Sequence, residues 1–311
     1  MKTNVLCVLA VVLAAVSASA QPAAQGGPAD PAAEQLREAQ PLVRAQKFDE
    51  ALAIYKRAIA EHPDSMSANI QAGTVLDYQG QYAAAKPFFA KAIELAGTTP
   101  ARMAQANRAM ALSYAFERDC KGATKYEVPV YEMYKAAKDA YNTGEIANEL
   151  ARVCLESGDL DTAAHWYEIG YAAGLAETNI APARKDLWEF RNENALARLA
   201  ARRGQRAEAE KHVALAKAVL DRGSNPEQKP FFAYLVGYVG FYLGDYQKAI
   251  AEMEGGNQND PFVLALIAQS YDKLGNKQKS GEYWQKSLSI TIHNPTGAYA
   301  RPLAKKALGL Q

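Results

Sequence analysis

The sequence has few cysteines, no excess of charge of either sign and no long apolar run beyond its first 20 residues. Its 311 residues include 35 Lys and Arg against 34 Asp and Glu, which leaves a net charge of +1. This balance argues against the basic surface of a nucleic-acid-binding protein and against an acidic tail. A membrane-spanning helix needs about 20 apolar residues, so the N-terminal apolar run is too short to span a bilayer, and we expect no transmembrane segment in the rest of the chain.

Catalytic motifs are also missing. The sequence contains no Gly-x-Ser-x-Gly, no phosphate-binding Gly-x4-Gly-Lys-Ser/Thr and no zinc-binding His-Glu-x-x-His. The four histidines lie far apart, without the spacing of metal ligands. We therefore expect no enzymatic activity, no cofactor and no metal site.

Residues 1–20 have the pattern of a secretory signal peptide. Lys2 gives a positive start, residues 5–16 are apolar, and small residues precede a cleavage site after Ala20. This pattern predicts a secreted or periplasmic protein; the alternative is an uncleaved anchor. Residues 21–33 are rich in Pro, Gly, Ala and Gln, which is typical of a disordered leader.

The segments 48–63 and 82–97 repeat each other. They match at small and aromatic positions, Ala51 with Ala85, Tyr55 with Phe89 and Ala58 with Ala92, each pair offset by 34 residues. The spacing i, i+4, i+7 within each segment places these residues on one face of a helix. A unit of about 34 residues is too short for an independent core, so it must stack on copies of itself.

This arrangement resembles the tetratricopeptide repeat, which has two antiparallel helices per unit and small residues where they cross. The resemblance implies an all-α fold, an α-solenoid of stacked antiparallel helix pairs whose first helices line a concave face. The alternative is an ordinary helical bundle in which the similarity of the two segments is a coincidence. We expect six to seven units, at 34–64, 65–97, 100–140 (degenerate), 144–175, 186–222, 230–255 and 260–290, followed by a capping helix at 295–311.

Cys120 and Cys154 are the cysteines that remain after signal cleavage. Cys120 falls at the start of one expected helix and Cys154 near the end of the next, and antiparallel packing brings these ends together. A disulfide is one hypothesis, and two buried free thiols are the other.

Candidate binding residues lie on the expected first helices of the third to fifth units. Residues 148–152 and 194–198 share the pattern Asn-x-Leu-Ala-Arg, which projects Asn and Arg from one helix face. Arginine suits carboxylates and asparagine suits a peptide backbone. The candidates are Arg108, Asn148, Arg152, Arg191, Asn194, Arg198 and Arg202. The alternative is that duplication repeats ordinary surface residues.

An aromatic stripe follows in the sixth unit. Tyr234, Tyr238, Phe241 and Tyr242 are spaced i, i+4, i+7, i+8, offset from two glycines that suit a close helix crossing. We expect these rings to face the concave groove, although some of them could instead be core.

These features together predict a non-catalytic scaffold that holds a segment of a partner protein in its concave groove. The ligand would place carboxylate or backbone groups against Arg152, Asn194 and Arg198, and an apolar side chain on Tyr234 and Tyr238. A glycan-binding accessory protein of envelope or polysaccharide metabolism is the alternative, and a structural self-assembling array is a third hypothesis. The lysine and asparagine positions by which chaperone adaptors hold protein tails are occupied here by Leu36, Gln40 and Gln71, so that function is not expected.

Overall fold

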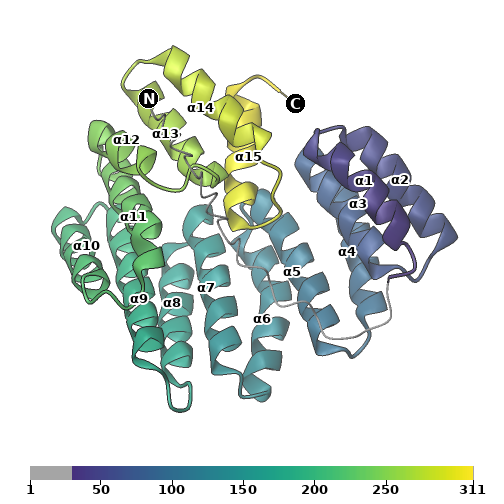
Figure 1. The fold of residues 1–311 in the computed structure, drawn as a ribbon, viewed down its shortest axis with the longest axis horizontal. Helices are drawn as coiled ribbons and strands as arrows, with labels where there is room; N and C mark the ends of the chain where they lie inside the picture. The colour runs from purple at the N-terminus through teal and green to yellow at the C-terminus, as the bar shows by residue number, and fades with distance from the viewer. Residues whose placement is uncertain (1–29, 311) are drawn as a thin grey trace, which may run out of the picture.

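The computed structural model describes residues 30–310. Over this range the chain forms fifteen α-helices, one short 3-10 helix and no strand. The expected all-α architecture of stacked helix pairs is confirmed (Figure 1). The expected signal peptide and most of the expected leader lie outside the described residues.

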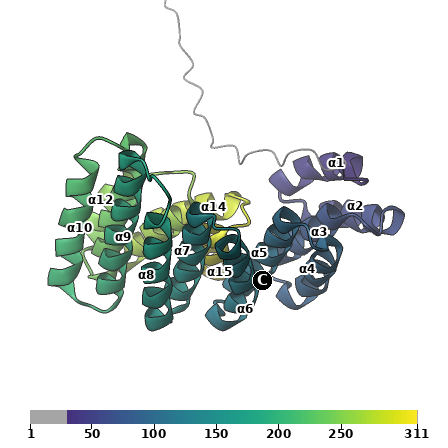
Figure 2. The ribbon, with the colours of Figure 1, turned by 90° about the horizontal axis from the view of Figure 1, so that it is seen from below.

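Consecutive helices pack against each other as pairs. The pairs are α1 (Ala33–Arg44) with α2 (Phe48–Glu61), α3 (Met66–Gln79) with α4 (Tyr82–Ala96), α5 (Pro100–Phe116) with α6 (Cys120–Ala136), α7 (Ala140–Ser157) with α8 (Leu160–Leu175), α9 (Pro182–Arg202) with α10 (Arg206–Leu220), α11 (Lys229–Tyr242) with α12 (Tyr246–Glu254), and α13 (Pro261–Lys273) with α14 (Lys277–Ser289). The 3-10 helix η1 (Pro226–Gln228) precedes α11, and α15 (Pro295–Ala307) ends the fold. Figure 2 shows the helices standing side by side along a row, from α1 and α2 at one end to α10 and α12 at the other.

The repeated positions form the contacts between helices. Ala51, Ala58, Ala85 and Ala92 are fully buried. Gly73 in α3 faces the ring of Phe89 in α4, and a Cβ on this glycine would lie 2.7 Å from the ring atoms. The sequence therefore places a residue without a side chain where the two helices approach most closely.

Some boundaries differ from those expected. The degenerate third unit forms a full pair of 17-residue helices, and its second helix ends at Ala136. Helix α9 begins at Pro182, four residues before the expected start of its unit at residue 186, because a proline in the first helical turn removes no intrahelical hydrogen bond. Asp30, in the expected leader, accepts a hydrogen bond of 2.7 Å from Ser65 Oγ, so contacts with the second unit begin before residue 34.

Cys120 and Cys154 form a disulfide, with their Cα atoms 4.7 Å apart. It joins the first residue of α6 to the last turn of α7. The bond therefore connects two neighbouring helix pairs, and both cysteines belong to a buried hydrophobic cluster.

Helix α15 does more than cover the last pair. It packs on α13 and α14 but also contacts α5 and α7, and in Figure 1 it lies between the last helix pair and the first ones. Arg301 and Lys305 of α15 donate hydrogen bonds to the carbonyl oxygens of Tyr78 and Gln79 at the end of α3. The expected capping helix therefore also reaches the second pair, because the row curves until its two ends meet.

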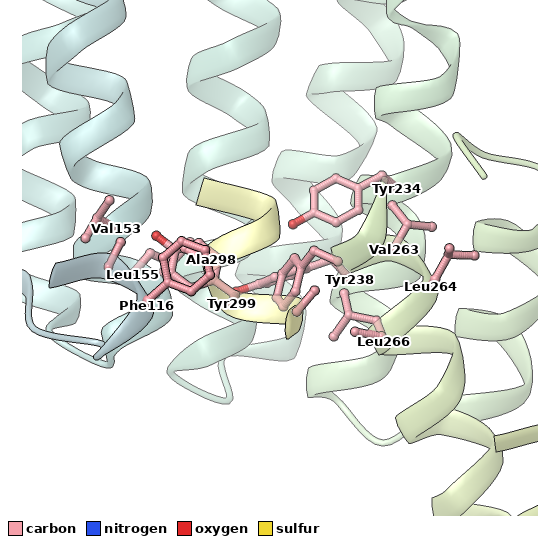
Figure 3. Close-up of a cluster of buried hydrophobic side chains, with 14 of the residues drawn as sticks. Phe116, Val153, Leu155, Tyr234, Tyr238, Val263, Leu264, Leu266, Ala298 and Tyr299 are labelled. Atoms are coloured by element: carbon pink, nitrogen blue, oxygen red, sulfur yellow. The ribbon is translucent and has the colours of Figure 1, made fainter. Parts of the chain in front are cut away.

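A single hydrophobic cluster fills the space beneath α15. Figure 3 shows Ala298 and Tyr299 of α15 between Val153 and Leu155 of α7 and Tyr238 of α11. The ring of Tyr299 is fully buried and lies 5.7 Å from that of Phe262. None of the helices in residues 30–310 is long and apolar enough to cross a membrane.

Candidate functional site

A cavity of about 310 Å³ remains on the concave side, between α7, α8, α9, α11 and the first residue of α15. We call it the α7–α11 pocket. Six of the eleven predicted ligand-binding residues line it, namely Asn148, Arg152, Arg191, Asn194, Arg198 and Tyr234. The volume lies at the lower end of the range for ligand sites, about 300–1,000 Å³. The pocket can therefore hold a small molecule or a short part of a larger one.

The two Asn-x-Leu-Ala-Arg segments supply four of these pocket-lining residues. They occupy the same place on α7 and α9, the first helices of successive pairs; Leu150, Ala151 and Ala197 are buried, whereas Leu196 is partly exposed. Burial of Leu150 and Ala151 turns Asn148 and Arg152 toward the concave side. On α9, Asn194 and Arg198 are largely buried and line the same cavity, so both Asn–Arg pairs reach one pocket.

Three of the five predicted arginines are neutralised inside the protein. The ion pairs are Arg108 with Glu149, Arg191 with Glu145, and Arg202 with Glu156. All three glutamates lie on α7, at spacings i, i+4 and i+11 that place them on one side of the helix. This spacing is a signal of the pairing that is present in the sequence itself. These arginines have little charge left for a ligand.

Arg152 and Arg198 differ from the other three because neither forms an ion pair with a carboxylate within residues 30–310. Arg198 is only 7% exposed, and its Nε donates a hydrogen bond of 3.4 Å to the backbone oxygen of Asn194. The Nε of Arg152 is buried without a hydrogen-bond partner. The negative charge of Asp260 favours the charged form of Arg152, but the Asp260 carboxylate does not bond to Arg152. It accepts hydrogen bonds from the backbone at the start of α13. The pocket thus has two uncompensated positive charges.

Two tyrosine hydroxyls complete the polar wall. The hydroxyl oxygens of Tyr167 and Tyr234 are buried and have no hydrogen-bond partner in the described part of the chain. Burial raises the pKa of Tyr234 to about 12, and it also raises the pKa of Tyr167. Both hydroxyls therefore keep their protons at neutral pH and can donate hydrogen bonds. The guanidinium of Arg198 lies 5.5 Å from the ring centre of Tyr167, and that of Arg152 lies 5.9 Å from Tyr234.

The rest of the aromatic stripe is packed against other side chains. Tyr238 is fully buried, and its hydroxyl donates a hydrogen bond of 2.8 Å to Glu156. Its ring lies 4.5 Å from that of Tyr242, which packs on Phe241 at 5.0 Å. Tyr238 is in the same buried cluster as Leu155 of α7 and Val263 and Leu266 of α13. The glycan alternative needed an exposed stripe for stacking, and these rings do not provide one.

One apolar residue at the pocket was not predicted as a site residue. Phe231 is 51% exposed and lines the pocket at the start of α11, opposite Phe190 of α9. Phe231 belongs to the aromatic segment of the sixth unit in the sequence, but only the packing of α11 beside α9 places it at the pocket. Within residues 30–310, no group of three or more His, Cys, Asp or Glu residues is arranged to hold a metal ion.

Comparisons with known proteins agree with the helix-pair repeat. A family model described as a tetratricopeptide repeat matches residues 36–100. No curated protein matches the chain. Similar solved structures include a tetratricopeptide repeat protein from Parabacteroides merdae, with 13% identity over 88% of this chain and 98% of that one and a TM-score of 0.48.

Two further solved structures are similar over most of this chain. A chain of the APC/C hetero-tetramer Cut9-Hcn1 is 18% identical over 87% of this chain, with a TM-score of 0.42, and this chain spans 48% of its length. The tetratricopeptide repeat domain of P58(IPK) is 12% identical, with 89% of this chain and 98% of that chain covered and a TM-score of 0.25. The matched segment 36–100 covers the first two helix pairs, and the same pairing continues to Ser289. Residues 36–100 are thus similar to the tetratricopeptide repeat family.

Proposed function

We propose that this protein is a non-catalytic scaffold that binds a segment of a partner protein at the α7–α11 pocket. The match of residues 36–100 to the tetratricopeptide repeat supports the general class, because arrays of this repeat serve as protein-interaction scaffolds. One observation supports the location: Arg152 and Arg198 line the pocket without a carboxylate partner, whereas Arg108, Arg191 and Arg202 are paired. A buried charge without a partner is unfavourable, so a negatively charged group on a partner would stabilise this arrangement.

In this binding mode an acidic group of the partner lies between Arg152 and Arg198. The side-chain amides of Asn148 and Asn194 line the same pocket and can both donate to and accept from a peptide backbone. An apolar side chain of the partner packs on Phe231, which takes the role that the sequence suggested for Tyr238. Only a short part of the segment enters, because the pocket is small and α15 covers the neighbouring part of the groove.

We also propose that the protein acts outside the cytoplasm, in a periplasm or as a secreted protein. The signal-like pattern of residues 1–20 supports this location. The disulfide between Cys120 and Cys154 fits an oxidising compartment. Identification of the N-terminal residue of the mature protein by mass spectrometry tests it; a mature chain that begins at Met1 would contradict the proposed cleavage.

A peptide array tests the docking site. Labelled full-length protein is applied to immobilised random peptides and to matched copies in which every Asp and Glu is replaced by Asn or Gln. We expect the protein to bind a subset of the acidic peptides and to lose them in the amide copies. The double variant Arg152→Gln, Arg198→Gln should bind that subset at least about 100-fold more weakly, since hydrogen bonds to charged groups contribute about 1.5–3 kcal/mol each.

The control variant is Arg203→Gln, at the exposed end of α9, where Arg203 pairs with the exposed Asp161. It should bind as the unmodified protein does. Circular dichroism of both variants verifies that they remain helical. Equal binding by the double variant and the unmodified protein would reject the pocket as the docking site.

A further inference from the structure

We infer that the group bound between Arg152 and Arg198 is a compact oxyanion that carries two negative charges, of the phosphate or sulfate type. The inference depends on the proposed function only for the location of the site. It specifies the chemistry of the ligand, which the family does not.

The charge balance of the pocket supports a dianion. Glu145 and Glu149 line the pocket, but each is paired with an arginine, Arg191 and Arg108 respectively. Two positive charges therefore remain on its wall, on Arg152 and Arg198. A single carboxylate would neutralise one of them and leave the other in surroundings where charge is poorly screened. A group with two negative charges neutralises both.

The hydrogen-bond donors point to the same class of ligand. Four donor side chains from α7, α8, α9 and α11 line the pocket, namely Arg152, Tyr167, Arg198 and Tyr234. The hydroxyls of both tyrosines and the Nε of Arg152 have no partner within the described residues. A carboxylate has two oxygens, whereas a phosphate ester has three that accept strong hydrogen bonds. The tetrahedral group matches donors that converge from four helices.

Two sources could supply this group, either a free ion or an ester on a larger molecule. Phe190 and the half-exposed Phe231 line the pocket beside the polar residues. They can pack against the organic part of an ester, and they offer nothing to a free ion. The two sources therefore differ in affinity, and this difference can be measured.

Isothermal titration calorimetry of the full chain at pH 7.5 and constant ionic strength tests the charge requirement. The probes are sulfate, inorganic phosphate, phenyl phosphate and acetate. We expect sulfate and phosphate to bind once per chain, and acetate to bind at least tenfold more weakly. Phenyl phosphate binding more tightly than inorganic phosphate supports the site with an ester as ligand, and equal binding of the two supports it with a free ion.

Variants test which side chains carry the binding. Arg152→Gln and Arg198→Gln should each weaken sulfate binding about 10- to 100-fold. Arg152→Lys and Arg198→Lys keep the charge but lose the planar fork, so they should weaken it less. Arg203→Gln, directly after the end of α9, is the matched control and should change nothing.

Tyr234→Phe separates a binding role from a structural one. Removal of a buried hydroxyl that has no partner should raise the melting temperature of the protein without ligand, because an unsatisfied buried polar group is costly. The same change should weaken sulfate binding several-fold. Opposite signs for the two measurements are expected only if the hydroxyl serves a ligand.

Two results would overturn the inference. One is acetate binding as tightly as sulfate, and the other is sulfate binding that is unchanged in Arg152→Gln, Arg198→Gln and Tyr234→Phe. If acidic peptides still require Arg152 and Arg198 on the peptide array while sulfate does not bind, the dianion is rejected and the proposed function is kept. If sulfate binds through these arginines but no peptide on the array does, docking of a segment through Asp or Glu is rejected and the oxyanion site is kept.

Discussion

The Nε atom of Arg301 donates a hydrogen bond of 2.8 Å to the carbonyl oxygen of Tyr78, 223 residues earlier in the chain. The Nζ atom of Lys305 does the same to Gln79, at 2.6 Å. These carbonyls belong to the last turn of α3, where backbone acceptors have no partner within the helix and cations are favoured. Helix α15 therefore caps α3 and connects the last part of the array to its second helix pair.

Loss of this contact should destabilise the protein measurably. Arg301→Met keeps much of the side-chain volume but leaves the carbonyls of Tyr78 and Leu288 without these donors. We expect a loss of about 1–3 kcal/mol in the free energy of unfolding, measured by urea denaturation. Amide hydrogen exchange should accelerate in α3 and α15 more than in α9 and α10.

The control is Arg57→Met, which removes an exposed ion pair with Glu38. Exposed pairs contribute about 0–1 kcal/mol, so this variant should differ little from the unmodified protein. Equal losses in the two variants would show that Arg301 does not hold the array closed.

Reduction of the disulfide should also weaken the fold. Cys120 and Cys154 are 34 residues apart in sequence, and closing a loop of this length restricts the unfolded chain by about 3–4 kcal/mol. We expect a loss of this size when unfolding in urea is measured with and without reductant. The double variant Cys120→Ala, Cys154→Ala should show no effect of reductant. Mass measurement after alkylation counts free thiols directly, and two alkylated cysteines without reductant would contradict the bond.

The stability of the protein should decrease as pH rises because of Glu127. Burial of this fully buried carboxyl, together with the nearby charge of Glu149, holds its pKa well above the ordinary value of 4.5. The folded protein keeps the proton above pH 4.5, whereas the unfolded chain releases it. The free energy of unfolding therefore falls by up to about 1.4 kcal/mol per pH unit from this pH until the pKa of the folded state is reached.

Glu127→Gln should remove this contribution to the slope, because the amide does not titrate. Urea denaturation at several pH values between 5 and 8 measures the difference from the unmodified protein. Glu132→Gln is the matched control, because Glu132 is exposed on the same helix α6. A slope that is the same in Glu127→Gln as in the unmodified protein would show that Glu127 is ionised in the folded state.

Two helical glycines should respond in opposite directions to an added methyl group. A Cβ on Gly174 of α8 would overlap the indole ring of the fully buried Trp188, so Gly174→Ala should cost about 1–3 kcal/mol. A Cβ on Gly281 of α14 would meet no atom within 4 Å, so Gly281→Ala should stabilise by about 0.5–1 kcal/mol. Thermal unfolding of both variants tests this, and a stabilising Gly174→Ala would contradict the packing of α8 on Trp188.

The helix pairs could be predicted from the sequence because their contacts are local. Ala51, Tyr55 and Ala58 recur 34 residues later as Ala85, Phe89 and Ala92, and all of these side chains are buried. Each pair depends on residues within one or two units, so the pattern alone specifies it. The family match and the helix order agree with that prediction.

The closure by α15 could not be predicted in this way. It depends on the curvature of the whole row, which accumulates from small rotations between successive pairs. Arg301 and Lys305 look like ordinary cations at the end of a terminal helix, and only the folded row brings them to α3. The burial of Tyr238 has the same origin, because other elements of the curved array cover it.

For the candidate site, the sequence indicated the right helices but not the balance of charge. The shared Asn-x-Leu-Ala-Arg pattern pointed to Arg152 and Arg198, which do line one pocket. It did not separate them from Arg108, Arg191 and Arg202, since the pairing of those three depends on contacts with glutamates 41 to 46 residues away. Whether these residues bind a ligand stays a prediction for the experiments above.

The hydrogen bonds between α15 and α3 have a consequence for how this protein can evolve. Duplicating or deleting one helix pair is a simple change in most repeat arrays, because each unit contacts only its neighbours. Here such a change between α4 and α14 would shift α15 by the rise and rotation of one unit and separate Arg301 from Tyr78. The number of units between these residues is thus constrained by geometry, and variation in length should be confined to the loops.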